Sequence, residues 1–279
     1  MENKKIYIPP LKIQGIKTKL VPAIHDLILN TNFEKWVEPF MGSGVVGFNL
    51  APSNALFCDN NPYIINLYND IKGNNITAKI AKEFLISEGL KLEKLNEQHY
   101  YDIRDRFNKY HNSLDFLFLN RSDFNGMIRF NKKGDFNVPY GHKPKRFSQA
   151  YITKICNQIN YVQSMTSKNN WIFLCQNFED TLKDIKTSDI IYCDPPYIGR
   201  HVDYYDTWDE NSEKELHKNL INTGAKFILS TWHHNKYRKN EYIEKIWKNC
   251  NIKTTEHFYF IGAKEINRNS MIEALLYNF

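Results

Sequence analysis

The sequence predicts an α/β protein whose core is an open, largely parallel sheet. Three segments support this fold class: residues 36–47 have the pattern of a short strand, a glycine-rich turn and a helix start, residues 55–58 that of a second strand, and residues 190–193 that of a third. Two prolines end the third strand because they lack the amide hydrogen that a continuing ladder needs. Ligands bind at the carboxyl ends of the strands in such sheets, so the residues that follow these strands form the candidate site.

The composition favours a globular protein over a membrane protein, a disulfide-stabilised protein or a zinc-stabilised one. The chain has 279 residues, of which 42% are hydrophobic and 14% aromatic, enough apolar material for a globular core. No apolar run approaches the length of a membrane span and the N-terminus lacks a signal-peptide core, so we expect a soluble, cytoplasmic protein. The five cysteines include no Cys-x-x-Cys pair, which argues against a disulfide framework and a structural zinc site.

At the start of the chain, a loop over residues 9–17 precedes a helix expected over residues 18–29. Gly15 permits a close approach of the backbone to a ligand. Lys17 stands near the helix start, where its charge suits an anionic group better than it suits the helix dipole. Simple exposure to solvent is the alternative interpretation of this lysine.

The glycine-rich turn after the first strand leaves backbone amides open to a nucleotide-like ligand. Gly42, Gly44 and Gly47 satisfy the G-x-G-x-x-G spacing. The second strand ends in Asp59, at the distance where an acid accepts hydrogen bonds from ribose hydroxyls. Residues 59–62 also fit an ordinary turn, and both interpretations stay open.

Residues 71–166 differ in character from the segments on either side. Residues 77–95 are charged, with apolar side chains at three- and four-residue steps, as in a surface helix. We therefore expect a small, mainly helical domain over residues 71–166, inserted into a sheet domain made of residues 1–70 and 167–279.

Nearly all of the net charge of +6 falls in one part of this insertion. Between residues 121 and 146, seven basic residues stand against two acidic ones, with aromatic residues interleaved. This composition is typical of a nucleic-acid surface, although a solvated face is the simpler alternative. Turns at residues 125–126 and 133–135 bracket residues 127–130 as a β-hairpin. In it, Arg129 is the candidate for reading a guanine, with a phosphate contact as the alternative.

The corner after the third strand carries the most specific chemistry, because Asp194, Pro195, Pro196 and Tyr197 follow one another directly. An exocyclic amine on a base is a poor nucleophile, since its lone pair is delocalised into the ring. It improves when acceptors draw its hydrogens out of conjugation. The Asp194 carboxylate and the Pro195 carbonyl supply two acceptors, and Tyr197 offers a ring for stacking. A plain exit turn is the alternative, and Cys193 should point to the opposite side of the strand.

Beyond this corner, residues 198–208 have the composition of a mobile loop beside the site. Ser212 and Glu215 then form a capping-box signature for the next helix.

Residues 227–232 have the pattern of a further core strand, and residues 257–261 and 272–277 that of a closing antiparallel pair. Between them, His233 and His234 point in different directions and have no nearby carboxylate. A polar loop is therefore preferred to a metal site, and no metal ligand is predicted.

In order along the chain, these motifs resemble those of the Dam-type DNA adenine-N6 methyltransferases. The stretches that carry the resemblance are PLKIQGIK from Pro10, EPFMGSG from Glu38, DNNP from Asp59, LNRSDFNGMIRFN from Leu119, KGDFNVPYG from Lys133 and DPPY from Asp194. The resemblance implies a Rossmann-like methyltransferase sheet with an inserted, mainly helical target-recognition domain that carries the β-hairpin. It also implies that an adenine is flipped out of double-stranded DNA and methylated at N6 with S-adenosyl-L-methionine.

The resemblance assigns residues to three roles. The catalytic residues would be Asp194, Pro195, Pro196 and Tyr197. The cofactor would be held by Gly15, Lys17, Phe40, Met41, Gly42, Ser43, Gly44, Asp59, Asn60, Asn177, Phe178 and Asp194. DNA would be contacted by Arg121, Asn125, Met127, Arg129, Asn131, Lys133, Pro139, Tyr140, His142 and Lys143. The chain departs from the family at Asn177, where an acidic residue is common, and at Ile13 and Ile16, where an aromatic residue and a glycine are common.

Other functions share this chemistry. A cytosine-N4 enzyme is disfavoured because that class more often has serine where Asp194 stands, and an RNA or protein amino-methyltransferase would not explain the basic segment. The intact glycine turn and corner argue against a DNA-binding protein with a vestigial cofactor site. The family's commonest target is GATC, but departures in the first motif and at Ile128 and His142 leave the recognition sequence open. In a prokaryote or phage, the expected partners are double-stranded DNA and a cognate restriction endonuclease that acts on the same site without a stable complex.

Overall fold

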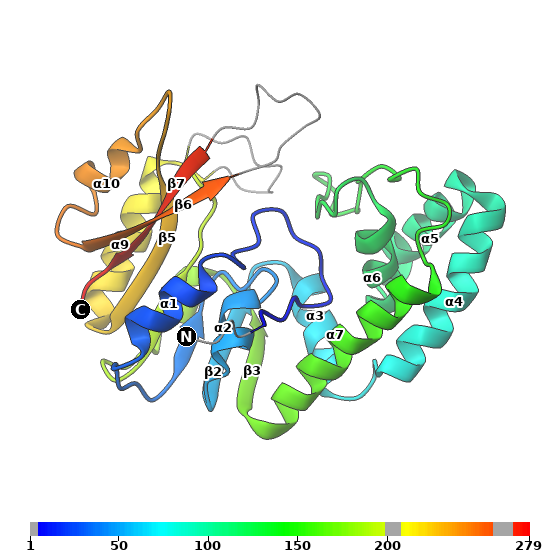
Figure 1. Cartoon of the computed structure of the whole chain (residues 1–279), viewed down its shortest axis with the longest axis horizontal. Coiled ribbons are helices and arrows are strands. Elements are labelled where there is room, and N and C mark those ends of the chain that lie inside the picture. Colours follow the sequence, from blue (N-terminus) through cyan, green and yellow to red (C-terminus); the bar gives the residue numbers. More distant parts are fainter. Residues whose placement is uncertain (1–4, 199–207, 259–269) are drawn as a thin grey trace.

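The computed structural model describes residues 5–198, 208–258 and 270–279. Within them, seven strands form one sheet in the order β3-β2-β1-β4-β5-β7-β6 (Figure 1). The strands are β1 (Trp36–Glu38), β2 (Asn54–Asp59), β3 (Asn170–Cys175), β4 (Ile190–Cys193), β5 (Lys226–Asn235), β6 (Asn251–Phe258) and β7 (Ser270–Tyr277). The strands from β3 to β5 run parallel, whereas β7 is antiparallel to both β5 and β6. The predicted α/β fold class is confirmed.

The order of the strands reverses at β1, which lies between β2 and β4. Trp36 of β1 is paired with Ala55 on one side and with Ile190 on the other. The glycine turn follows β1, Asp59 is the last residue of β2 and Asp194 follows β4, so all three lie at one edge of the sheet. Such a reversal leaves a crevice at the carboxyl ends of the strands, and ligands of open α/β sheets bind there.

Helices cover both faces of the sheet. One face packs against α1 (Val21–Ile28), α2 (Val45–Leu50) and α3 (Pro62–Lys72), and the other against α8 (Phe178–Lys183), α9 (Glu210–Thr223) and α10 (Glu241–Lys245). Because successive side chains of a strand point to opposite faces, Trp36 belongs to the first core and Val37 to the second. No described helix is long and apolar enough to span a membrane.

Four further helices lie together beside α3, on the right in Figure 1. They are α4 (Ala78–Leu95), α5 (Glu97–Tyr110), α6 (Ser113–Ser122) and α7 (Gln149–Lys168). Their buried side chains, such as Phe107 and Phe116, belong to the same continuous core as Trp36 and Phe57 of the sheet. The segment is mainly helical, as expected, and its division from the sheet as a separate domain stays a prediction.

Two helix starts show how local capping chemistry sets the boundaries. The helix expected over residues 77–95 is α4, whose N-cap Thr77 accepts a hydrogen bond from the Ile80 amide. The capping-box prediction at Ser212 is wrong by one turn, because Asp209 is the N-cap of α9 and accepts from the Ser212 amide. An aspartate three residues earlier satisfies the same amide, so the helix begins before the serine.

Other expectations differ in detail. The hairpin around residues 127–130 exists only as isolated bridges, Phe130 with Phe136 and Asp123 with Tyr140. His233 and His234 lie within β5, so the predicted polar loop is wrong. The late antiparallel pair is confirmed as β6 and β7. Residues 199–207 of the predicted mobile loop and residues 259–261 of the first late strand lie outside the described residues.

Candidate active site

The glycine turn is tied to the end of β2 by two hydrogen bonds. The Met41 amide donates to the Cys58 carbonyl (2.7 Å), and the Gly42 amide donates to Asp59 Oδ2 (2.8 Å). Gly42 and Gly44 have φ angles of 50° and 71°, a region that favours glycine. The turn thus requires glycine at these two positions, and Gly44 is the N-cap residue of α2.

The buried carboxyl group of Glu38 is hydrogen-bonded to α2, the helix that follows this turn. Glu38 is 1% exposed, and its Oε1 accepts hydrogen bonds from Trp36 Nε1 (2.8 Å) and the Gly47 amide (2.7 Å). Burial raises the pKa of Glu38 to about 8. Gly47 lies so close that an added Cβ would stand 2.6 Å from Glu38 Oε1 and 2.5 Å from the Phe57 ring. This third glycine is therefore required by packing rather than by its backbone angles.

Asp59 uses both carboxylate oxygens to shape the loop in which it sits. Oδ2 accepts from Gly42 and Oδ1 accepts from the Asn61 amide (2.9 Å). Burial raises the pKa of this group, and the two amides oppose that rise. Each oxygen keeps a second lone pair, so Asp59 can hold the turn and still accept a ligand hydroxyl. The neighbouring Asn60 contributes its carbonyl to a contact with the exposed Cys175.

Three aromatic rings gather at the same edge. The Phe40 and Phe178 rings are stacked with centroids 5.5 Å apart, and the Trp208 ring is edge-on to both. Sequence reasoning did not single out Trp208, which lies far along the chain from Phe40. Asn177 is the N-cap of α8, and its Oδ1 accepts from the Asp180 amide (2.7 Å). The predicted cofactor residue Asn177 therefore has a structural task of its own.

The corner after β4 is organised by the Asp194 carboxylate. Its Oδ2 lies 3.0 Å from Lys17 Nζ, and its Oδ1 accepts a hydrogen bond from Ser230 Oγ (2.8 Å). Lys17 also donates to the Gly15 carbonyl (2.8 Å), and its Nζ lies 4.9 Å from the centroid of the Tyr197 ring. Burial raises the pKa of Asp194, while Lys17 and Ser230 lower it. The predicted residues Gly15, Lys17, Asp194 and Tyr197 are thus brought together.

Two residues of this corner come from strands that sequence reasoning left out of the site. Ser230 lies on β5, and Glu273, which accepts a hydrogen bond from the Tyr197 hydroxyl (3.2 Å), lies on β7. Both are buried, with 0% and 2% of their surface exposed. Glu273 is the only charged residue of β7, whereas Ser230 stands beside Thr231 in a strand that ends in polar residues and so carries no distinctive sequence signal. Met41 and Ser43 are also buried, and the Ser43 carbonyl accepts from Tyr68 Oη (2.7 Å).

Among the predicted DNA-contacting residues, two lie in the interior. Arg121 is 6% exposed, and its guanidinium donates to Gln158 Oε1 and to the Tyr151 hydroxyl. Tyr140 is fully buried, with its ring against that of Tyr100. The prediction that these two side chains contact DNA does not agree with their burial. The basic signal of Arg121 reflects a polar contact between α6 and α7.

The remaining candidates lie on or near the surface. Arg129 is half-buried and donates from Nε to Asn137 Oδ1 (2.9 Å), while Asn131 Oδ1 accepts from the amides of Lys133 and Asp135. Met127 is also half-buried, and the exposed candidates are Asn125, Lys133, Pro139, His142 and Lys143. These exposed residues all belong to the irregular segment between α6 and α7.

The N-terminal loop contacts this segment. The Lys12 backbone exchanges two 2.8 Å hydrogen bonds with the Asn120 side chain of α6. Lys12 also lines a small cleft, together with Ser122, Asp123, Phe124, Asn125, Gly141, Lys143 and Arg146. Burial raises the pKa of Asp123 to about 8. Neither Lys12 nor Asn120 had been assigned a role from the sequence, because the contact joins residues 108 positions apart.

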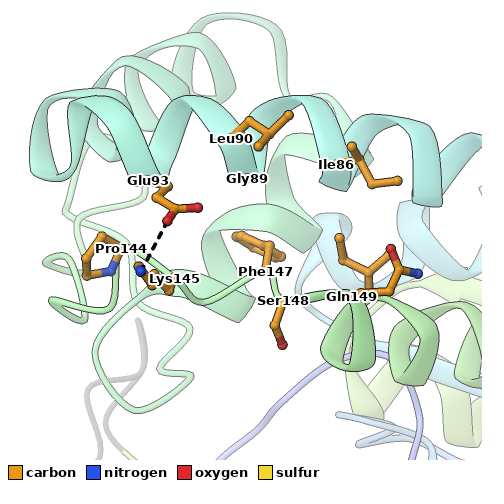
Figure 2. A pocket seen from close by; sticks show the side chains of 10 residues that line it. Ile86, Gly89, Leu90, Glu93, Pro144, Lys145, Phe147, Ser148 and Gln149 are labelled. Atoms are coloured by element: carbon orange, nitrogen blue, oxygen red, sulfur yellow. Dashed lines mark ion pairs between the residues drawn. The ribbon is translucent and has the colours of Figure 1, made fainter.

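Another hollow lies between α4 and the segment that leads into α7. Figure 2 shows Leu90 and Ile86 on one side and Phe147 on the other, with an ion pair between Glu93 and Lys145 (3.5 Å). It contains none of the residues predicted for the site. No cluster of histidine, cysteine, aspartate and glutamate able to hold a metal ion occurs among the residues that the structure describes.

Comparison with known proteins places this geometry in context. Residues 14–261 match the model of the family described as D12 class N6 adenine-specific DNA methyltransferase. A Type II methyltransferase of Methanocaldococcus jannaschii is 29% identical, over 97% of this chain and 99% of its own length. A Type II methyltransferase of Lactococcus lactis subsp. cremoris is 28% identical, over 100% of this chain and 98% of its own. A DNA adenine methylase of Vibrio cholerae is 34% identical, over 67% of this chain and 64% of its own.

Proposed function

Since the chain belongs to the D12 class N6 adenine-specific DNA methyltransferase family, we propose that its sheet edge binds S-adenosyl-L-methionine and a flipped adenine side by side. The observation that carries this proposal is the position of Asp194. It follows β4 directly, next to the glycine turn that follows β1, and β1 and β4 are neighbouring strands. A group bound at the turn and a base held by Asp194 would therefore meet at one point.

The residues around the turn fit the proposed cofactor. Gly42 and Gly44 leave backbone without side chains, Asp59 offers acceptors for ribose hydroxyls, and the Phe40 and Phe178 rings offer apolar faces for an adenine. When bound, S-adenosyl-L-methionine supplies a methyl group whose bond to the sulfonium sulfur breaks with both electrons left on sulfur. The chain's own task is to hold the acceptor amine in line with that bond.

Asp194 Oδ2 and the Pro195 carbonyl are the proposed acceptors for the two hydrogens of the adenine N6 amine. Holding both hydrogens out of the ring plane restores the lone pair that attacks the methyl carbon. The amine becomes positively charged as the new bond forms, and one of its protons then passes to Asp194 and on to solvent. The Tyr197 ring stacks on the base, with its hydroxyl fixed by Glu273.

Lys17 occupies the same carboxylate oxygen that the amine needs. Its ammonium lies 3.0 Å from Asp194 Oδ2. We infer that the incoming amine displaces Lys17 from this oxygen. The ammonium keeps Asp194 charged until then, which matters because only the charged carboxylate accepts without also donating.

Double-stranded DNA is the proposed substrate, and the segment between α6 and α7 is the proposed reading surface. Flipping costs a few kcal/mol of lost stacking, which contacts on this surface and in the pocket must offset. The exposed Asn125, Lys133 and Lys143 are available for it, with Arg129 beside them. Residues 71–166 would then act as the target-recognition unit.

A role in restriction-modification is the proposed biological context. The two Type II methyltransferases match over nearly the whole of both chains, whereas the DNA adenine methylase matches about two thirds of each. We therefore propose a site-specific enzyme of a prokaryote or phage, acting in the cytoplasm. Its counterpart would be an endonuclease that cleaves the same unmethylated sequence.

The decisive experiment is methylation mapping by single-molecule sequencing. Unmethylated genomic DNA is incubated with the purified protein and S-adenosyl-L-methionine, with Asp194→Ala as the control. N6-methyladenine within one short motif, absent from the control, is the expected result. N4-methylcytosine, or no methylated base despite cofactor binding in a calorimeter, would refute the proposed function.

A further inference from the structure

A chain of two hydroxyl groups runs through the core to the candidate catalytic carboxylate. Tyr192 Oη donates to Ser230 Oγ (3.1 Å), and Ser230 Oγ donates to Asp194 Oδ1 (2.8 Å). Tyr192 is 2% exposed and Ser230 is fully buried. Buried hydroxyls are costly unless they are paired, so a serine and a tyrosine at these positions call for an explanation beyond packing.

The register of the sheet explains how Ser230 reaches Asp194. Cys193, the last residue of β4, is paired with Leu229 of β5, so the next residue of each strand stands beside the other. Ser230 is therefore fixed by the sheet ladder and not by a loop. The tyrosine ring that backs it is stacked on the Trp36 ring, with centroids 5.9 Å apart. Both hydroxyls sit on rigid elements.

The two carboxylate oxygens of Asp194 have different partners. Oδ1 is occupied by Ser230, whereas Oδ2 faces Lys17 at the corner. We propose that Ser230, backed by Tyr192, is a positioning residue for Asp194, holding Oδ1 so that Oδ2 is presented to the target amine. This inference rests on the proposed function, since it concerns the carboxylate proposed to hold that amine.

Ser230 has a second consequence, for the charge of Asp194. Two charged groups act on the pKa of this carboxylate: Lys17 lowers it and Glu273 raises it. The other titratable groups nearby are Glu38, Tyr192 and Cys193, and burial raises the pKa of each. Once an amine has displaced Lys17, the Ser230 hydroxyl is the donor that stays on Asp194. A hydrogen bond to the charged form lowers the pKa of a carboxyl group.

The hydrogen bonds connect Tyr192 to Asp194 through Ser230. The Tyr192 hydroxyl donates to Ser230 Oγ, which leaves the single serine proton to be donated elsewhere. Two acceptors are within reach, and Asp194 Oδ1 at 2.8 Å is closer than the Cys193 carbonyl at 3.3 Å, so the proton is donated to Asp194. Hydrogen bonds in such a chain strengthen one another. The effect of removing the Tyr192 hydroxyl should therefore depend on the presence of the Ser230 hydroxyl.

The test compares Ser230→Ala, Tyr192→Phe and the double variant with the wild type. The substrate is a duplex oligonucleotide carrying the motif found by methylation mapping, and the readouts are kcat, KM and the pH profile of kcat. Thr223→Ala is the control, because the Thr223 hydroxyl at the end of α9 donates to the Leu220 carbonyl (2.7 Å), outside both the candidate site and residues 71–166. Cofactor affinity by calorimetry and flipping by 2-aminopurine fluorescence are measured in parallel.

We expect Ser230→Ala to lower kcat by about 10- to 100-fold through misplacement of the acceptor. Its KM, cofactor affinity and 2-aminopurine signal should stay near those of the wild type. The acid limb of its pH profile should move to higher pH, since Asp194 loses a donor to its charged form. Tyr192→Phe should shift the limb in the same direction by less, and should add nothing to Ser230→Ala.

Several outcomes would overturn the inference. One is a Ser230→Ala enzyme whose kcat and pH profile match those of the wild type and of Thr223→Ala. Another is a Tyr192→Phe effect that persists undiminished in the double variant. Should Ser230→Ala fail to fold, Tyr192→Phe alone decides, because it keeps the ring and removes only the hydroxyl. A wild-type enzyme that methylates no adenine would instead refute the proposed function, so the two failures are distinguishable.

Discussion

Glu38→Gln should change how the stability of the protein depends on pH. Glu38 is 1% exposed beneath the glycine turn, and burial raises its pKa from 4.5 to about 8. The folded state therefore holds a proton that the unfolded state releases, once the pH exceeds 4.5. Glutamine keeps the oxygen that accepts from Trp36 and Gly47 and has no proton to lose.

The sign of the effect follows from linkage. Between pH 4.5 and about 8, the folded state binds more protons at Glu38 than the unfolded state, so the free energy of unfolding falls as pH rises. Each pKa unit corresponds to about 1.4 kcal/mol, so the interval sets an upper limit on the order of 5 kcal/mol. Relaxation and water entry reduce this value, and we expect about 1–3 kcal/mol.

Urea unfolding of the wild type and of Glu38→Gln, at several pH values between roughly 5 and 8, measures the effect. The difference in unfolding free energy, variant minus wild type, should increase with pH across this window. Other buried carboxyl groups, such as Asp123, affect both proteins alike and cancel in that difference. Glu83→Gln, at an exposed position of α4, is the control. Parallel curves for wild type and Glu38→Gln would refute the reasoning.

Three further predictions concern packing, ion pairing and DNA. Gly47→Ala gains about 1 kcal/mol of helix propensity, but its Cβ would stand 2.5 Å from the Phe57 ring. The free energy of unfolding in urea should therefore fall by about 1–3 kcal/mol, and an equal or higher unfolding midpoint would contradict this. Arg106→Ala should cost about 1–3 kcal/mol, because the buried Asp115 carboxylate loses a two-point hydrogen-bond partner; an unchanged melting temperature would contradict it. Lys143→Ala should weaken DNA binding and reduce its salt slope by about 1, and a slope equal to that of the wild type would remove Lys143 from the proposed surface.

Agreement between sequence and structure is closest where a motif is contiguous. The strand before Asp194 ends where two prolines require it to end, and Gly42 and Gly44 adopt the positive φ angles that their turn demands. The helix expected over residues 77–95 is present as α4, which begins directly after its N-cap Thr77. In each case the deciding interactions join residues a few positions apart. Agreement is weaker where two local signals compete, as at Asp209 and Ser212, or where exposure decides the role, as at Arg121.

The α/β class, the glycine turn, the Asp-Pro-Pro-Tyr corner after β4 and the family resemblance were all predictable from sequence, because each depends on residue types at fixed short spacings. The surroundings of Asp194 depend instead on contacts between distant parts of the chain. Lys17 reaches it from the N-terminal loop, and Ser230 reaches it from β5. The path of the N-terminal loop and the register of β4 and β5 bring these groups together across long stretches of chain, and the residues next to Lys17 or Ser230 in the sequence carry no local sign of the partner.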